Sequence, residues 1–455
     1  MLPLLPGALG HRRQAGDGPG LRPAHRRSSA RRTPFAGAHR PTGAGGLRRR
    51  PGGASPEAAD GGGAGVRRAC FFRLGYFPQE EHLRKNARAL CEAGYQVDVV
   101  CLREPGQPGV ERYWGGFVFR LPMAHRRTGL LRHLWEHLAF CLLLAVLVPA
   151  LWAWRRHSVL EFYGPPDYAV FAALLPRLLG ARLVLYIFDL LPETLARGLG
   201  LGEDSLAVRL AGWAERASTA LAQAVVVEGP HERDVVVARG TPAEKVVWVP
   251  NVPDEDVFRP SAGVSPPEDG FVVMTHGTLL ARYGIDEVVR AAALLRGRIP
   301  RLRAWIVGEG EHRPVAQALA ASLGLDGVVT FVGWVPYASL AALVARADVG
   351  VVPLRFNSLP NKLFEYALSG RAVVAADLPS IRRLFGDALL YFPPGDAGAL
   401  AEAISRLYAD PDLRRRLGEA AREVAQRHAW SRVRHLYVAL HESGPRGIPL
   451  PESDA

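Results

Sequence analysis

The chain has 455 residues, too many for one hydrophobic core, so we expect at least two domains. Its formal net charge of +12 would suit a nucleic-acid-binding protein, but residues 1–68 carry 13 arginines against three acidic residues, a local net charge of +10. The remaining chain is therefore close to +2, which argues against a broad basic surface and is ordinary for a soluble enzyme.

Residues 1–68 are rich in Gly, Pro, Ala and Arg and poor in large apolar side chains, so we expect a disordered basic leader. A nucleic-acid-binding arm is the alternative, but its aromatic content is limited to Phe35, and we expect no nucleic-acid partner. The four cysteines of the chain lack metal-ligand spacing, and no convincing signal peptide precedes them. Buried thiols in a cytoplasmic protein are the expectation.

Residues 69–250 alternate short apolar strands with helices. Strands are expected at "ACFFRLGY", "QVDVVCL", "FVFRLP", "SVLEFYG", "RLVLYIFDL" and "AVVVEG". Near-continuous apolar strands that alternate with helices indicate a parallel sheet covered on both faces. We therefore predict a Rossmann-like first domain over residues 69–250.

Within this domain, residues 138–154 form an uncharged apolar stretch, "LAFCLLLAVLVPALWAW", flanked by basic residues. Three interpretations stay open: a helix that spans a membrane, a core helix, and a helix that rests on a membrane surface. A spanning helix needs about 20 apolar residues, and Pro149 interrupts this one. We favour a helix resting on the anionic inner face of the cell membrane, with tryptophans at the headgroup level.

Residues 251–269 are dense in Pro, Asp and Gly and are expected to be an interdomain linker. A second run of strands and helices then predicts another Rossmann-like domain over residues 270–428. Residues 429–455 are expected to form a helix that packs back on the first domain, followed by a tail. The expected fold class is thus α/β, with two parallel sheets facing a central cleft. Ligands of such sheets bind outside the carboxyl ends of the strands.

Two loops of the second domain follow strands and contain glycine. In "HGTLLARYGIDEVV" the strand ends before Gly277, and a helix is expected from about Ile285. Free backbone N–H groups at a helix start favour an anion, and Arg282 adds a positive charge in the same loop. The second loop, "IVGEGEH", contains Gly308 and Gly310 but lacks the rest of a dinucleotide fingerprint, so we interpret it as a tight strand-to-helix turn.

Two acidic triplets, residues 254–256 and 410–412, could suggest a divalent metal. The first lies in the expected linker, and Asp410 fits the N-cap of a helix, so we predict no metal site.

The stretch "FNSLPNKLFEYALSGRAVVAAD" predicts a short helix between two strands, with Ser358 as its N-cap and Gly370 just past its end. Lys362 lies in the first turn, where a cation opposes the helix dipole and is suited to a bound anion. Glu365, one turn later, could accept two hydrogen bonds from a vicinal diol such as ribose. The alternatives are a solvated glutamate and a surface lysine.

The order of "PNVPDEDVFRP", "HGTLLARYG", "WIVGEGEH", "VVTFVGWVP", "ARADVGVVPL" and "LPNKLFEYALSGRAVVAAD" closely resembles the retaining nucleotide-sugar glycosyltransferases of the GT-B fold, family 4. The resemblance covers residues 70 to 443 and is strongest from 245 to 395. It implies transfer of a sugar from a nucleoside diphosphate sugar, with retained anomeric configuration and without a metal ion or other cofactor.

The resemblance also implies roles for residues of the second domain. Glu365 matches the glutamate that binds the ribose, and Asn357 stands where a second glutamate usually meets the donor sugar. Val335 matches the position whose backbone contacts the base. Gly277 belongs to the donor-binding loop.

The family's basic pair for the diphosphate is replaced in this chain by Thr278 and Tyr283. Arg282 and Lys362 are therefore assigned as the catalytic cations, from their place in the pattern.

In the first domain, "YFPQEEHLRKNARAL" resembles the family's first strand-to-helix loop, which implies that Gly75 lies near the acceptor. "LYIFDLLPE" resembles a pattern that usually reads His-Asp; Phe188 replaces the histidine and Asp189 remains. Asp189, as a catalytic candidate, and Glu193, as an acceptor-binding candidate, are expected to face the sugars.

In this mechanism the two cations and the helix N-termini stabilise negative charge that develops on the leaving diphosphate. We expect a glycan or lipid-linked acceptor. Two alternatives stay open: a nucleotide-sugar epimerase on the same fold, and a degenerate, non-catalytic binding module.

Overall fold

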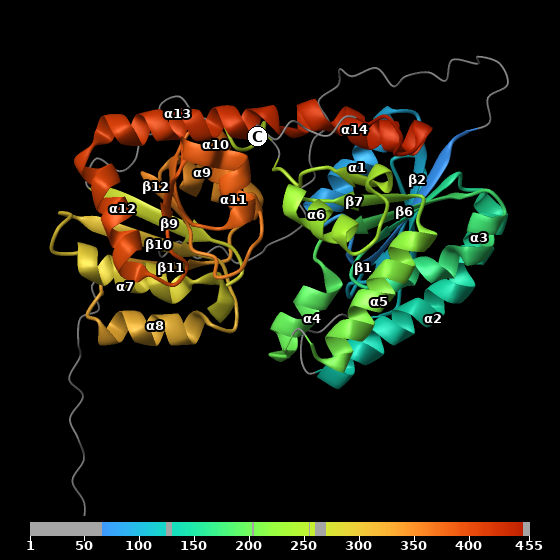
Figure 1. Ribbon diagram of the computed structural model, residues 1–455, viewed down its shortest axis with the longest axis horizontal. Helices are drawn as coiled ribbons and strands as arrows, with labels where there is room; N and C mark the ends of the chain where they lie inside the picture. The colour runs from blue at the N-terminus through green and yellow to red at the C-terminus, as the bar shows by residue number, and fades with distance from the viewer. Residues whose placement is uncertain (1–65, 124–129, 203, 254, 260–269, 449–455) are drawn as a thin grey trace, which may run out of the picture. The chain divides into compact units, whose positions relative to one another are not determined.

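The structure is a computed structural model that describes residues 66–123, 130–202, 204–253, 255–259 and 270–448. The disorder predicted for residues 1–68 therefore falls outside the described residues, apart from the last three. Most of the predicted linker also lies outside them. The described chain contains two α/β domains, each with helices on both faces of a sheet (Figure 1), which confirms the predicted fold class of two Rossmann-like domains.

The first domain is built on a sheet whose described strands run in the order β3-β4-β2-β1-β5-β6-β7-β8. All neighbouring pairs are parallel except β3 and β4. The strands are β1 (Arg68–Tyr76), β2 (Gln96–Leu102), β3 (Val110–Tyr113), β4 (Gly116–Leu121), β5 (Val159–Tyr163), β6 (Arg182–Ile187), β7 (Ala224–Val227) and β8 (Val246–Trp248). The prediction missed β3 and β8. The residues of β3, "VERY", are mostly exposed at the sheet edge and give no apolar run, and β8 has only three residues.

The helices of the first domain are α1 (Glu81–Glu92), α2 (Leu130–Arg155), η1 (Asp167–Ala173), α3 (Leu174–Leu178), α4 (Leu191–Leu199), α5 (Leu206–Leu221), α6 (Pro230–Ala238) and η2 (Ala243–Lys245). The C-terminal helix α14 (Trp430–Ser443) also packs on this domain. The hydroxyl of Tyr437 donates to the buried carboxylate of Glu161, at 2.6 Å, and Nε2 of His441 lies 2.8 Å from the same carboxylate. A buried side chain of the first sheet is thus hydrogen-bonded to the C-terminal helix α14.

The second domain has a wholly parallel sheet with the described strands in the order β11-β10-β9-β12-β13-β14. These strands are β9 (Phe271–His276), β10 (Leu302–Val307), β11 (Val329–Gly333), β12 (Val349–Val352), β13 (Ala372–Ala376) and β14 (Leu390–Phe392). Numbered within the domain, the order is 3-2-1-4-5-6, and the direction of strand addition reverses between β9 and β12. Ligands of doubly wound sheets bind at the carboxyl ends of the strands at this reversal.

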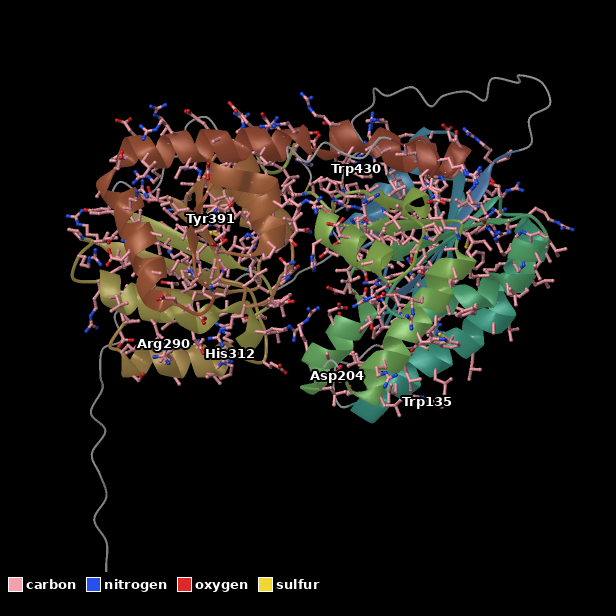
Figure 2. The ribbon with its side chains drawn as sticks, viewed as in Figure 1. Trp135, Asp204, Arg290, His312, Tyr391 and Trp430 are labelled. Atoms are coloured by element: carbon pink, nitrogen blue, oxygen red, sulfur yellow. The ribbon has the colours of Figure 1, made fainter. Side chains whose placement is uncertain are left out.

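The helices of this domain are η3 (Ala281–Tyr283), α7 (Ile285–Leu295), α8 (Arg313–Ser322), α9 (Tyr337–Ala345), α10 (Asn361–Leu368), α11 (Pro379–Phe385), η4 (Gly386–Ala388), α12 (Ala397–Ala409) and α13 (Pro411–Arg427). Side chains fill the space between the helices and the sheet (Figure 2). Asp410 caps α13 as predicted, because its carboxylate accepts from the backbone N–H of Leu413 at 2.8 Å.

The prediction that Ser358 caps α10 is wrong. The helix begins at Asn361, and Pro360 is its N-cap, with an extended backbone. A residue that precedes proline is disfavoured in the helical region, so Leu359 cannot begin the helix. The predicted end is confirmed: Gly370 has φ +69°, and its N–H donates to the carbonyl of Ala367.

Candidate active site

The loop after β9 lies across the turn after β10, at the point where the strand order reverses. The backbone N–H of Gly277 donates to the carbonyl of Val307 at 3.0 Å, and that of Leu279 donates to the carbonyl of Glu309 at 2.9 Å. The helix α10 follows β12, which is the neighbour of β9. Its first turn therefore lies at the same edge of the sheet.

Close packing of these two loops explains the glycines of "IVGEGEH". A Cβ added to Gly308 would lie 1.9 Å from the carbonyl oxygen of Gly277, and one added to Gly310 would lie 2.2 Å from that of Leu279. Side chains at these positions would force the loops apart. The structure thus accounts for the Gly-x-Gly as a packing requirement, in agreement with the predicted strand-to-helix turn.

Lys362 brings an amine to this loop from α10. Its Nζ lies 3.5 Å from the position that a Cβ on Gly277 would occupy. The side chain is only 8% exposed, and among the described residues Nζ has no hydrogen-bond acceptor. Burial lowers the pKa of Lys362 from 10.5 to about 8, and the attraction of Glu365 offsets part of this effect. A buried cation with unused N–H donors is well placed to bind an anion.

Glu365, on the same helix, is buried next to His276, the last residue of β9. Nε2 of His276 lies 3.0 Å from Oε2 of Glu365. Although this distance suits an ion pair, the angle does not suit a hydrogen bond, and both atoms are buried without a hydrogen-bond partner. The carboxylate therefore has acceptor capacity left for a ligand hydroxyl. Sequence reasoning did not single out His276, although its place at the end of a buried strand beside Gly277 was a usable signal.

The structure does not bring Arg282 into contact with Lys362 or Glu365. Its side chain is exposed, and its guanidinium lies 5.2 Å from the ring centre of Tyr283. Its backbone carbonyl accepts from the N–H of Arg355 at 3.3 Å. Gly284 ends this segment at φ +71°, and α7 starts at the next residue, as predicted. Arg282 is thus exposed to solvent, whereas the amine of Lys362 is buried beside Gly277.

Asn357 has a structural contact that the sequence did not reveal. Its Oδ1 accepts from the backbone N–H of Ser380 at 2.9 Å, in the first turn of α11, while its Nδ2 is buried without a partner. One half of the amide is therefore committed to the fold, and the N–H half is available to a ligand. Val335, half-buried, follows β11.

Comparison with known proteins decides the family. Residues 79–252 match the model "Glycosyl transferase 4-like domain", and residues 270–410 match "Glycosyl transferases group 1". The chain belongs to the family 4 glycosyltransferases of the GT-B fold.

Relatives and solved structures agree with this assignment. The alpha-D-kanosaminyltransferase of Streptomyces kanamyceticus is 28% identical over 276 residues, 57% of this chain and 69% of that protein. The lipopolysaccharide core biosynthesis glycosyltransferase LpsE of Rhizobium meliloti is 33% identical over 187 residues, and the match spans 40% of this chain and 53% of LpsE, about half its length.

Among solved structures, the sucrose-phosphate synthase of Thermosynechococcus elongatus superposes with a TM-score of 0.68 at 22% identity, covering 83% of this chain and 98% of that one. HepE of Anabaena, solved with UDP and glucose, superposes with a TM-score of 0.61 at 16% identity, covering 82% of this chain and 99% of that one. These likenesses show the fold.

The first domain of this glycosyltransferase carries the other expected residues. A Cβ on Gly75 would lie 1.8 Å from Oε1 of Glu80, so the glycine makes room for that carboxylate. Asp189, the second residue after β6, is exposed. Glu193, in α4, forms an ion pair with Arg239. The three residues therefore have different environments, and Asp189 is the one with an open side chain at the carboxyl end of a strand.

Phe188, where the family usually has histidine, packs among aromatic and basic side chains. Its ring centre lies 5.0 Å from that of His82 and 4.6 Å from the guanidinium carbon of Arg73. Within the described part of this glycosyltransferase, no cluster of three or more His, Cys, Asp or Glu could hold a metal ion.

Proposed function

We propose that the chain transfers a sugar from a nucleoside diphosphate sugar to an acceptor hydroxyl, with retention and without a metal ion. The observation that carries this proposal is the buried amine of Lys362 beside Gly277, at the strand-order reversal of the second domain. HepE, which shares the fold, was solved with UDP and glucose, and this supports a nucleoside diphosphate as the ligand.

The diphosphate would lie against the backbone of the Gly277 loop and the first turn of α10. Lys362 would neutralise charge as the bond between sugar and phosphate breaks and negative charge builds on the leaving group. Arg282, exposed on the same loop, would reach the diphosphate from the solvent side. Glu365 would accept hydrogen bonds from the two ribose hydroxyls, and the free N–H groups of Asn357 would serve the donor sugar.

The acceptor would meet the first domain, where Asp189 is the exposed acid after β6. In this proposal Gly75 and Glu193 lie near the acceptor. Gly75 makes room for the carboxylate of Glu80, and Glu193 holds Arg239 by an ion pair. The name of LpsE supports a cell-envelope glycan as the acceptor class, because that relative acts in lipopolysaccharide core biosynthesis. A cytoplasmic location is part of the proposal, because the described cysteines are free thiols.

Calorimetry with UDP and other nucleoside diphosphates tests the site. We expect wild-type binding and a loss of at least about tenfold for Lys362→Met and for Glu365→Gln, because each removes a charge-assisted hydrogen bond. Arg290→Met is the matched control, since it removes an exposed cation of the same domain from the outer face of α7. Equal affinity in all variants, or no binding by the wild type, would refute the proposal.

Incubation with a panel of nucleotide sugars then identifies the reaction. A glycosyltransferase releases nucleoside diphosphate in proportion to glycosylated acceptor, and the anomeric configuration of the product shows retention or inversion. An epimerase would convert the donor without any acceptor, and a binding module would bind nucleotide without turnover. EDTA should leave the rate unchanged if no metal takes part.

A further inference from the structure

From Leu138 to Trp154 the helix α2 carries apolar residues on all of its sides, but only one side of it packs on the domain. Phe140, Leu144, Val148 and Leu151 are buried, at the spacing of one helical face. The residues between them include Val146, which is 75% exposed. Within the described residues, Leu134–Arg155 is the stretch long and apolar enough to cross a membrane, and 28% of its most apolar window is buried.

The exposed apolar surface continues from α2 onto the neighbouring elements η1, α3 and α5. The short helix η1 packs on both α2 and α5, and α3 packs on α2 and η1, so these elements adjoin one another. Figure 1 shows α2, α3 and α5 together on the first domain. All three contribute exposed large apolar side chains, among them Trp135, Trp154, Leu175, Leu178, Leu179, Leu206, Leu210 and Trp213. We call this surface, formed by α2, η1, α3 and α5, the apolar face.

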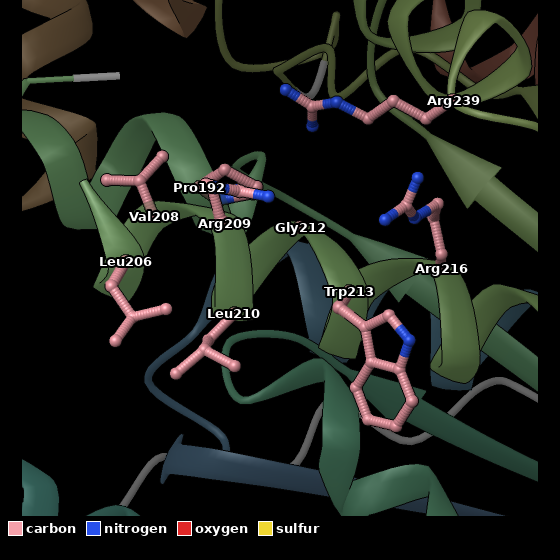
Figure 3. Close-up of a pocket in the computed structure, with 9 residues that line it drawn as sticks. All are labelled: Pro192, Leu206, Val208, Arg209, Leu210, Gly212, Trp213, Arg216 and Arg239. Atoms are coloured by element: carbon pink, nitrogen blue, oxygen red, sulfur yellow. The ribbon is translucent and has the colours of Figure 1, made fainter. Parts of the chain in front are cut away.

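Arginines line the margin of the apolar face at α5. Leu206, Leu210 and Trp213 project from one side of this helix, at positions i, i+4 and i+7 (Figure 3). Arg209 and Arg216, both exposed, leave α5 on the side that faces Pro192 and Arg239 (Figure 3). The same residues line an open hollow of about 500 Å³, into which Arg239 also points.

In the described part of the chain, two of these three arginines are free to bind an anion from outside the protein. Arg239 is held by ion pairs with Glu193 and Glu215. Arg209 and Arg216, by contrast, form no ion pair with another described residue, and Asp204 is an exposed acid near the start of α5. The face therefore combines large apolar side chains with two cations that lack an acidic partner within the described residues.

We propose that the apolar face docks on the surface of an anionic phospholipid bilayer. Exposed large apolar side chains gathered on adjoining elements mark an interaction surface. Leucines would enter the acyl boundary, while the tryptophans and the arginines Arg209 and Arg216 would lie at the level of the phosphates. The positive charge of the two arginines favours a partner with lipid phosphates over an uncharged protein surface. The apolar face belongs to the first domain and takes no part in the proposed donor chemistry.

The structure also explains why α2 rests on the bilayer instead of crossing it. Its buried side, with Phe140 and Leu144, belongs to the core of the first domain. Crossing would strip this side from the sheet and place Pro149, inside the helix, in the hydrocarbon region. The docked state leaves those contacts intact.

Vesicle co-sedimentation of the full chain tests the proposal. We expect binding to vesicles that contain phosphatidylglycerol and phosphatidylcholine, and much weaker binding to phosphatidylcholine alone. Arg209→Glu with Arg216→Glu should lower partitioning by at least about 25-fold, because each arginine at an anionic surface contributes about fivefold. Leu210→Ser with Trp213→Ser should lower it about tenfold.

Matched controls come from the exposed surface of the second domain. Arg406→Glu with Arg416→Glu makes the same change in net charge, and Leu294→Ser with Val315→Ser removes exposed apolar side chains. These controls should bind vesicles like the wild type, and circular dichroism should show that all variants are folded.

Three outcomes would overturn the proposal. One is a wild type that stays in the supernatant with anionic vesicles at low salt. The second is equal loss of binding in the control variants, which would show general charge attraction. The third is binding to neutral vesicles that resists high salt and alkaline carbonate, which would show that α2 inserts across the bilayer.

Discussion

Replacing Lys362 by methionine should make the protein more stable and weaken its nucleotide binding at least about tenfold. The structure buries the amine, and the pKa falls from 10.5 to about 8. Since a tenfold change in an ionisation equilibrium corresponds to about 1.4 kcal/mol, the folded state holds this charge at a cost of about 3 kcal/mol near neutral pH. Methionine fills a similar volume without charge, so Lys362→Met should raise the free energy of unfolding by about 3 kcal/mol at pH 7.

The sign of the pH dependence follows from the same pKa. Between about pH 8 and 10.5 the unfolded chain binds the proton and the folded chain has released it, so the wild type gains stability as the pH rises through this window. The advantage of Lys362→Met should therefore shrink to about 1 kcal/mol at pH 9.5. Wild-type affinity for UDP should fall as the pH rises through about 8, because the neutral amine no longer attracts the diphosphate.

Denaturant unfolding of wild type and Lys362→Met at pH 7 and pH 9.5, with UDP calorimetry on both proteins, measures these effects. Arg290→Met, which removes an exposed cation, should change neither the stability nor its pH dependence. A folded Lys362→Met protein that is no more stable than the wild type at pH 7, or that still binds UDP with wild-type affinity, would refute the reasoning.

Three further variants probe the site and its support. Glu365→Gln should keep the fold and raise the Kd for UDP about tenfold in calorimetry, because a neutral amide is a weaker acceptor for the ribose hydroxyls than a carboxylate. Gly284→Ala should lower the free energy of unfolding by about 3 kcal/mol or more, since φ is +71° and the new Cβ would lie 1.7 Å from a backbone carbonyl; Gly297→Ala, in open space, is its control in the same denaturation assay. Tyr437→Phe should cost about 1–3 kcal/mol by denaturation, because it removes a hydrogen-bond donor from the buried carboxylate of Glu161; an unchanged midpoint would contradict this.

Much of the fold could be predicted from local patterns. Strands such as β6 and β13 are buried along almost their whole length, and their uninterrupted apolar sequences indicated a parallel sheet covered on both faces. Gly370 marked the end of α10 because a left-handed residue there satisfies the last carbonyls. The edge strand β3 gave no such signal, since an exposed strand carries polar side chains.

The site was predicted in part. Lys362 and Glu365 were predicted as site residues because a lysine and a glutamate stand in a short apolar helix that follows a strand, and the structure buries both of them near Gly277. The partner of Glu365, His276, lies 89 positions earlier in the sequence, and only the pairing of β9 with β12 brings the two together. The bond from the N–H of Ser380 to Asn357 likewise joins residues that no local pattern connects.

The sequence by itself determined where the chain forms strands and helices and which loops follow the strands. These features depend on the spacing of apolar residues and on the positions of glycine and proline within a few residues. The tertiary structure decided how deeply the amine of Lys362 is buried, and therefore its pKa. It also decided which side of α2 is covered and which is exposed. Burial and long-range pairing depend on elements that are distant along the chain, and the sequence of one segment does not contain them.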